Sequence, residues 1–232
     1  MTRLADLTYQ DVALLADGGA VLVVPLGSTE QHGPHLPLST DTDLAVALCE
    51  QLALRRDVVV APAVAYGSSG EHAGFAGTLS IGQAALELLV VKLCRSATET
   101  FRHLLLVSGH GGNAEPVHRA VVTLRSEGRD VLTYFPCWDG EPHAGRAETA
   151  IQLVLRPDAV LLARAEAGDT RSIEELLPLL RSGGVLAVAP NGVLGDPRGA
   201  TAEEGRQLLA AMAVDLTRAV DAWLDRETTT AR

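Results

Sequence analysis

The chain has 232 residues, of which 47% are hydrophobic and 21% charged, and its formal net charge is −10. The apolar fraction excludes an intrinsically disordered chain, and the mixed composition excludes a fibrous repeat. The acidic balance argues against a protein that binds nucleic-acid phosphates, because such proteins carry an excess of basic residues. No apolar run approaches the ~20 residues of a membrane span, and the start MTRLADLTYQ lacks a signal-peptide pattern. We therefore expect a cytoplasmic protein without a nucleic-acid or membrane partner.

Short apolar runs alternate with amphipathic stretches along the chain. Residues 20–25 (AVLVVP) predict a buried strand, and a loop rich in Gly, Pro, His and Ser follows over 26–40. Asp41 then begins a predicted helix. The later predicted elements are a strand over 57–61, a polar glycine-rich segment over 66–80, a helix over 82–100, a strand over 103–107, a helix over 114–127, a strand over 130–135, and helices over 145–155 and 202–225.

Strands separated by helices of this length are typical of βαβ units and a parallel sheet. The strands are apolar almost throughout, as expected when helices cover both faces. We therefore predict an α/β fold with a single domain over 1–232, a three-layer α/β/α sandwich with a mostly parallel central sheet. Such sheets place their sites outside the carboxyl ends of their strands, which points to the loops after residues 25, 107 and 135.

The first of these loops carries three candidate ligands. Glu30 and His32 are two residues apart, so in extended backbone their side chains point the same way, about 6–7 Å apart. That spacing suits ligands of two different ions, because the ions of two-metal sites lie ~3.5–4 Å apart. Asp41 stands at the predicted helix start, where a carboxylate either bridges both ions or simply caps the helix.

The other two loops carry the remaining candidates. His110 lies among glycines directly after a buried strand; a phosphate-binding loop is the alternative, but no Lys or Ser/Thr follows in the required order. Glu148 lies about one turn into a predicted helix, where the helix dipole also favours an acid. His143 precedes that helix and could transfer protons as a neutral imidazole.

Together these residues predict one metal site with a catalytic role. Carboxylates and imidazoles without thiolates suit Zn, Mn or Fe(II). A pair of such ions lowers the pKa of bound water and polarises a carbonyl, so we expect two divalent ions per chain and hydrolysis of an amide bond. The predicted metal ligands are Glu30, His32, Asp41, His110 and Glu148, and the predicted catalytic residues are His143 and Glu148.

Neighbouring residues receive simpler interpretations. His35 and His72 are expected to line the site rather than to bind metal. Tyr66, Phe75 and Trp138 belong either to a substrate pocket or to the core. No serine stands in a G-x-S-x-G elbow, which argues against a serine hydrolase.

The motifs resemble those of the creatininase family of metal-dependent amidohydrolases. The resemblance rests on GSTEQHGPHLPLSTDT at 27–42, SGHGGN at 108–113 and HAGRAET at 143–149, and it covers nearly the whole chain. It implies a three-layer α/β/α fold, a two-metal centre and a homo-oligomer, commonly a hexamer. By motif, Glu30, Asp41 and His110 would hold one ion, and His32, Asp41 and Glu148 the other. His143 matches a histidine that shuttles protons.

One motif departs from creatininase itself, which has Tyr-Glu after the loop histidine, with the Glu ligating metal. Here these positions are Gly111 and Gly112, so we expect Glu148 to supply the missing acid. The loss of the tyrosine argues against creatinine as the substrate.

Within the family, the short length and APNGVLGDP at 189–197 resemble members that act in mycofactocin maturation. This implies a peptidase that releases the C-terminal Val-Tyr-derived unit from a modified precursor peptide. One alternative is a creatininase-like hydrolase of a small cyclic amide or formamide. An alternative of another class is a non-catalytic metal-binding scaffold.

Overall fold

A parallel sheet lies at the centre of the computed structural model, which describes residues 1–138 and 140–230. The sheet has the strand order β1-β3-β2-β4-β5, and each of its pairings is parallel. The strands are β1 Thr2–Arg3, β2 Val21–Leu26, β3 Val58–Val60, β4 His103–Ser108 and β5 Asp130–Tyr134. The helices are α1 Tyr9–Asp17, α2 Thr40–Ala53, α3 Gln83–Ala97, α4 Ala114–Ser126, α5 Arg146–Leu155, α6 Ile173–Val188 and α7 Ala202–Thr230.

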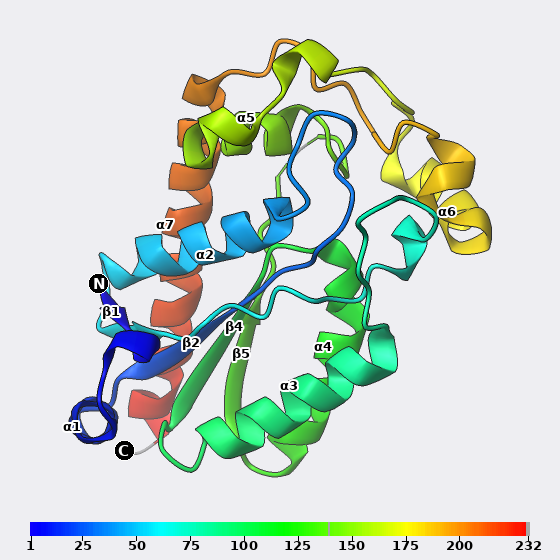
Figure 1. The fold of residues 1–232 in the computed structure, drawn as a ribbon. Helices are drawn as coiled ribbons and strands as arrows, with labels where there is room; N and C mark the ends of the chain where they lie inside the picture. Colours follow the sequence, from blue (N-terminus) through cyan, green and yellow to red (C-terminus); the bar gives the residue numbers. More distant parts are fainter. Residues whose placement is uncertain (139, 231–232) are drawn as a thin grey trace.

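Alternate side chains of the strands enter two separate cores. Leu22 and Val24 of β2 pack with α3 and α4, whereas Val21 and Val23 pack with α2 and α7. Burial of each such side chain stabilises the fold by about 1.5–3 kcal/mol. Figure 1 shows the resulting layers, with α3 and α4 on one face of the sheet and α2 and α7 on the other. The predicted α/β sandwich is confirmed.

Three elements lie outside those predicted from the sequence: β1, α1 and α6. Both helices begin with a capping box, formed by Thr8 with Asp11 and by Ser172 with Glu175. Helix α1 has no buried residue. Helix α6 is interrupted at Gly184, where φ is +70°, so its sequence does not follow one continuous helical period.

The sheet brings several loops to one edge. Strand β2 lies between β3 and β4, so the loops that follow these strands are neighbours in space. Helix α6 packs against the short 3-10 helix Gly70–His72 in the loop after β3 (Figure 1). Within the described residues, no helix combines the length and the apolar character needed to cross a membrane.

Candidate metal centre

The structure brings all five predicted metal ligands together at the carboxyl edge of the sheet. They come from the loop after β2, the first turn of α2, the loop after β4 and the first turn of α5. Each is at most 5% exposed, which is unusual for carboxylates. These residues are Glu30, His32, Asp41, His110 and Glu148.

The ligand atoms of these residues form two groups that share one member. Glu30, Asp41 and His110 offer one set of atoms within 4.8 Å of one another, and His32, Asp41 and Glu148 offer a second. The shared residue is Asp41, so its carboxylate stands between the two groups. Two groups with a shared carboxylate would suit a pair of divalent ions.

Asp41 does not cap helix α2. The residue at the N-cap position is Ser39, and Asp41 is the second residue of the helix. Its Oδ1 lies 3.2 Å from Nε2 of His32, and its Oδ2 lies 3.3 Å from Nδ1 of His110. The capping alternative is therefore wrong, because the carboxylate turns towards the two imidazoles instead of the backbone.

Three buried ligand atoms lie within ion-pair distance of other members of the site but form no hydrogen bond among the described residues. They are Oε1 of Glu30, Nε2 of His32 and Oδ2 of Asp41. A buried polar atom without a partner costs about 1–3 kcal/mol, and more when the group is charged. Divalent cations would satisfy all three atoms, and a donor set of carboxylates and imidazoles suits Zn, Mn or Fe(II). The residues present therefore fit a two-metal centre.

The acids and imidazoles of the site strongly shift one another's pKa values. Burial by itself raises the pKa of Asp41, but His32 and His110 together bring it below its usual range. Burial lowers the pKa of His32, yet the Asp41 carboxylate raises it to about 10. Burial raises the pKa of Glu148 to about 7, and His32 offsets this only in part. Metal binding must therefore displace protons from the imidazoles.

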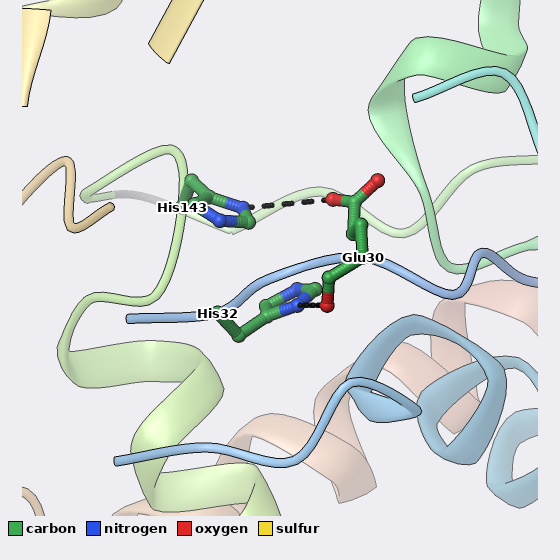
Figure 2. A group of neighbouring side chains, drawn as sticks. All are labelled: Glu30, His32 and His143. Carbon is green, nitrogen blue, oxygen red and sulfur yellow. Dashed lines mark hydrogen bonds and ion pairs between the residues drawn. The ribbon is translucent and has the colours of Figure 1, made fainter. Parts of the chain in front are cut away.

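His143 lies in the segment before α5 and is buried. Its Nδ1 is 3.9 Å from Oε1 of Glu30, and Figure 2 shows the ring facing that carboxylate. Its backbone oxygen accepts a hydrogen bond from Leu194, and the next residue, Ala144, adopts a φ of +51°. The N–H of Ala144 in turn donates to Glu148 at 2.5 Å. One tight turn thus positions both predicted catalytic residues.

The loop after β3 adds two residues that the sequence analysis did not assign to the metal site. Nε2 of His72 lies 3.3 Å from Oε1 of Glu30, and Oε1 of Glu71 lies 3.7 Å from Nε2 of His110. Burial raises the pKa of Glu71. No signal in the sequence indicated this, because the contact depends on strand order: β3 lies beside β2, so its loop reaches the same edge of the sheet.

Glu71 also lies beside position 112, where the chain departs from creatininase. A Cβ built on Gly112 would overlap the Glu71 carboxylate and the imidazole of His110. Glu148 lies instead in the group formed with His32 and Asp41. The carboxylate nearest to Gly112 is therefore that of Glu71, and not that of Glu148.

Asn113 connects the loops of the site through hydrogen bonds to their backbones. Its Nδ2 donates to the backbone oxygen of Gly27 at 3.0 Å, and its Oδ1 accepts from the N–H of Ser68 at 2.9 Å. Ser28 in the first loop donates to Oε2 of Glu30 at 3.0 Å. His35 is buried outside the ligand groups and contacts Thr149 at 2.8 Å. These contacts fix the loop backbones from which the ligands project.

A cavity of about 790 Å³ opens above these side chains. Four of the five predicted ligands line it, namely Glu30, Asp41, His110 and Glu148. One wall is formed by α6 through Leu177, Leu180 and Arg181. Of the three aromatic residues singled out in the sequence, Trp138 lines the cavity, Phe75 packs against α6, and Tyr66 is 51% exposed. The volume falls within the usual ~300–1,000 Å³ of ligand sites.

Comparison with known proteins identifies the family of the chain. The family model described as "Creatininase: Creatinine amidohydrolase" matches residues 5–220. The "Mycofactocin precursor peptide peptidase" of Mycolicibacterium smegmatis is 50% identical over 211 residues, which cover 88% of this chain and 85% of that protein. The "Creatinine amidohydrolase" of Pseudomonas putida is 33% identical over 192 residues, covering 68% of this chain and 74% of that protein.

Solved structures give the same result. A mutant creatininase superimposes with a TM-score of 0.80 at 26% identity, covering 94% of this chain and 97% of the other. Two further creatininase structures, described as "Zn-Zn type" and "Mn", match with TM-scores of 0.78 and 0.79 at 25% identity. They cover 94% of this chain and 96% and 97% of theirs. This chain therefore belongs to the creatininase family, whose members hydrolyse carbon–nitrogen bonds.

Proposed function

We propose that the chain is a two-metal peptidase that acts on a modified precursor peptide and releases its C-terminal Val-Tyr-derived unit in mycofactocin biosynthesis. The observation that carries the proposal is the pair of buried ligand groups that share Asp41 on the floor of a large cavity. The identity of 50% to the M. smegmatis peptidase supports the choice of substrate.

In this proposal, Glu30, Asp41 and His110 hold one divalent ion, and His32, Asp41 and Glu148 hold the other. When bound, two such ions lower the pKa of a water molecule and polarise the scissile carbonyl. Glu30 is kept in place by Ser28, and Glu148 by the backbone N–H of Ala144. The structures of relatives described as "Zn-Zn type" and "Mn" support zinc and manganese, and Fe(II) suits the same ligands.

His143 passes a proton to the leaving nitrogen. Burial lowers the pKa of its imidazole well below the usual value, so the ring is neutral and can accept a proton during the reaction. Its Nδ1 lies 3.9 Å from the Glu30 carboxylate, and this distance supports a role for the ring in the proposed proton transfer.

The cavity supports a peptide over a small cyclic amide as substrate. Its volume of about 790 Å³ suits a ligand of several residues. Only Phe135 and Trp138 contribute aromatic lining among the described residues, whereas α6 supplies aliphatic side chains and Arg181. The predicted cytoplasmic location, homo-oligomeric assembly and single-domain organisation accompany this proposal.

The first experiment measures metal stoichiometry by mass spectrometry on tag-free protein. We expect two ions per chain in the wild type and one fewer in Glu148→Ala, because only one ligand group contains that carboxylate. Substitution of the exposed Glu99 is the matched control and should leave the stoichiometry unchanged.

Cleavage is then assayed on the modified peptide and on creatinine. Release of the C-terminal unit by the wild type, and its loss in Glu148→Ala, would support the proposal. Reproducible binding of one ion or none after metal reconstitution would contradict it, as would hydrolysis of creatinine without cleavage of the peptide.

A further inference from the structure

Helix α6 presents a row of apolar side chains to the cavity. Ile173, Leu177 and Leu180 follow one another at intervals of four and three residues, so they lie on one face of the helix, and all three line the cavity. Leu180 packs against the small core beneath α6, whereas Ile173 and Leu177 are each 40% exposed. Large apolar side chains left exposed on the wall of a cavity are typical of a surface that a ligand covers.

Arg181 lies beside this row. It follows Leu177 by four residues, so it belongs to the same face of the helix, and it also lines the cavity. Its side chain is exposed, which places it where the cavity meets solvent. Among the described residues it forms no hydrogen bond or ion pair, whereas Arg171, just before α6, is paired with Asp169. The guanidinium of Arg181 is therefore available to a ligand.

The charges around the cavity favour an anionic ligand group at Arg181. It is the one lysine or arginine among the described residues that line the cavity. Three of the five lining carboxylates belong to the ligand groups, where two divalent ions would offset their charge. Glu115 is paired with Arg119 at 2.8 Å, and Glu71 lies 3.7 Å from His110. The anion that a peptide carries is a carboxylate, and a guanidinium binds it through two parallel hydrogen bonds.

The exposure of Arg181 selects the part of a peptide that reaches it. In the proposed function the released unit is C-terminal and derives from only two residues, and the scissile carbonyl lies at the metal ligands. The long part of the substrate, which must leave the cavity at its mouth, is therefore the part before the scissile bond. Arg181 and the exposed Ile173 and Leu177 line that exit.

We propose that Arg181, Ile173 and Leu177 form a subsite on α6 for an acidic side chain, next to an apolar one, in the part of the precursor peptide before the scissile bond. The inference rests on the proposed peptidase function for the direction in which the peptide lies. Arg181 holds the carboxylate, and the two aliphatic side chains cover the apolar neighbour. Because these contacts are the same before and during the reaction, the subsite lowers KM and leaves kcat unchanged.

The first test is steady-state cleavage of the modified precursor peptide by the metal-loaded protein. Arg181→Ala should raise KM about 3–5-fold at unchanged kcat, the upper range for one exposed ion pair. Arg181→Glu should raise KM about 10–30-fold, because repulsion of similar size replaces the attraction. The matched control is Arg218→Ala, an exposed arginine of α7 outside the cavity, which should behave as the wild type.

Changes in the peptide identify the partner of Arg181. Each Asp or Glu of the precursor is replaced in turn by Asn or Gln. One replacement should raise KM as much as Arg181→Ala does, and the two changes together should add nothing further. A lysine at that position of the peptide should restore cleavage by Arg181→Glu. If none of the replacements raises KM, the acidic partner does not exist and the proposal is wrong.

A pair of leucines tests the apolar part of the subsite. Leu177 and Leu179 lie on the same helix and are 40% and 41% exposed, but only Leu177 lines the cavity. Leu177→Ser should raise KM about 3–8-fold through the loss of apolar contact area, and Leu179→Ser should leave it unchanged. Equal effects of the two changes would overturn this part of the proposal. A change of molecular mass in Arg181→Ala, measured by light scattering, would overturn the subsite and assign α6 to a contact between subunits.

Binding of the product peptide separates the subsite from the peptidase function. The precursor fragment that ends at the scissile bond contains the acidic segment and is not cleaved, so its affinity is measured by fluorescence anisotropy on the metal-loaded protein. We expect Arg181→Ala to bind it about 3–5-fold more weakly and with a smaller dependence on salt. Equal affinities would overturn the subsite even if the precursor is cleaved. Binding that depends on Arg181, in a protein that does not cleave the precursor, would support the subsite and refute the peptidase function.

Discussion

Replacement of Gly112 by alanine tests the geometry of the ligand group around His110. Gly112 lies in the 3-10 helix Gly111–Asn113, directly after the predicted ligand. An added Cβ would overlap the imidazole of His110 and the carboxylate of Glu71, and would lie 2.5 Å from the backbone oxygen of Ser68. The Ser68 oxygen belongs to the backbone that Asn113 holds, so the side chains of His110 and Glu71 must move instead.

The size of the effect follows from these contacts. Overpacking of a well-filled site costs about 1–3 kcal/mol. Metal–nitrogen bonds of ~2.1 Å tolerate deviations of only about 0.2 Å, so displacement of the imidazole acts directly on metal affinity. A loss of about 1–3 kcal/mol corresponds to a metal affinity about 5–150-fold weaker. The ion held by His32 and Glu148 should be retained, because the nearest neighbours of a Cβ at Gly112 belong to Glu71, His110 and Ser68.

The assay is a calorimetric titration of the metal-free protein with Zn²⁺, together with thermal unfolding. Gly111→Ala is the matched control, since a Cβ at Gly111 has no neighbour within 4 Å. We expect Gly112→Ala to weaken one of two binding steps and Gly111→Ala to leave both unchanged. Equal affinities in Gly112→Ala and the wild type would refute the placement of His110 in a metal site.

Three other predictions follow from the same site. Asp41→Asn should weaken the binding of both ions, measured by mass spectrometry, because both ligand groups contain Asp41; two ions bound at wild-type affinity would contradict this. His143→Gln should keep both ions but lose about 10²–10⁴-fold in turnover, whereas substitution of the exposed His118 should change neither quantity. Metal affinity should rise with pH, by about 1.4 kcal/mol per pH unit for each proton displaced. The reason is that Asp41 raises the pKa of the buried His32 to about 10, so the His32 proton must leave before metal binds. A metal affinity that does not change with pH would show that no imidazole proton is displaced.

The stability of the metal-free protein should respond to pH in the opposite direction. The pKa of His32 is raised in the folded chain, so its pairing with Asp41 stabilises the fold fully below the ordinary pKa of 6.5. That contribution is lost as the pH rises towards about 10. Thermal unfolding with and without metal across this window separates the two effects, since bound metal replaces the proton.

The predictions from sequence were most complete where structure depends on local pattern. The run Val21–Leu26 is apolar at every position but the proline, and both faces of this strand are buried. Strand and helix positions follow from such periods, because burial selects side chains at fixed spacing. The candidate ligands Glu30, His32 and His110 could be predicted as well, because they lie in the loops that follow buried strands.

The contacts between loops could not be read in this way. Gln31 contacts His72 over a separation of 41 residues and His143 over 112. The contact with His72 depends on the order of the strands. Strand β3 lies beside β2, so the loop after β3 brings Glu71 and His72 to the metal site.

The sequence by itself determined the α/β class, the motif order and the chemical types of the ligands, because hydrophobic periodicity and residue chemistry are local properties. Tertiary structure alone decided that Asp41 does not cap α2, that Glu71 lies beside Gly112, and that Gln31 contacts two histidines. Such contacts depend on strand order and loop packing, which arise only when the whole sheet has formed.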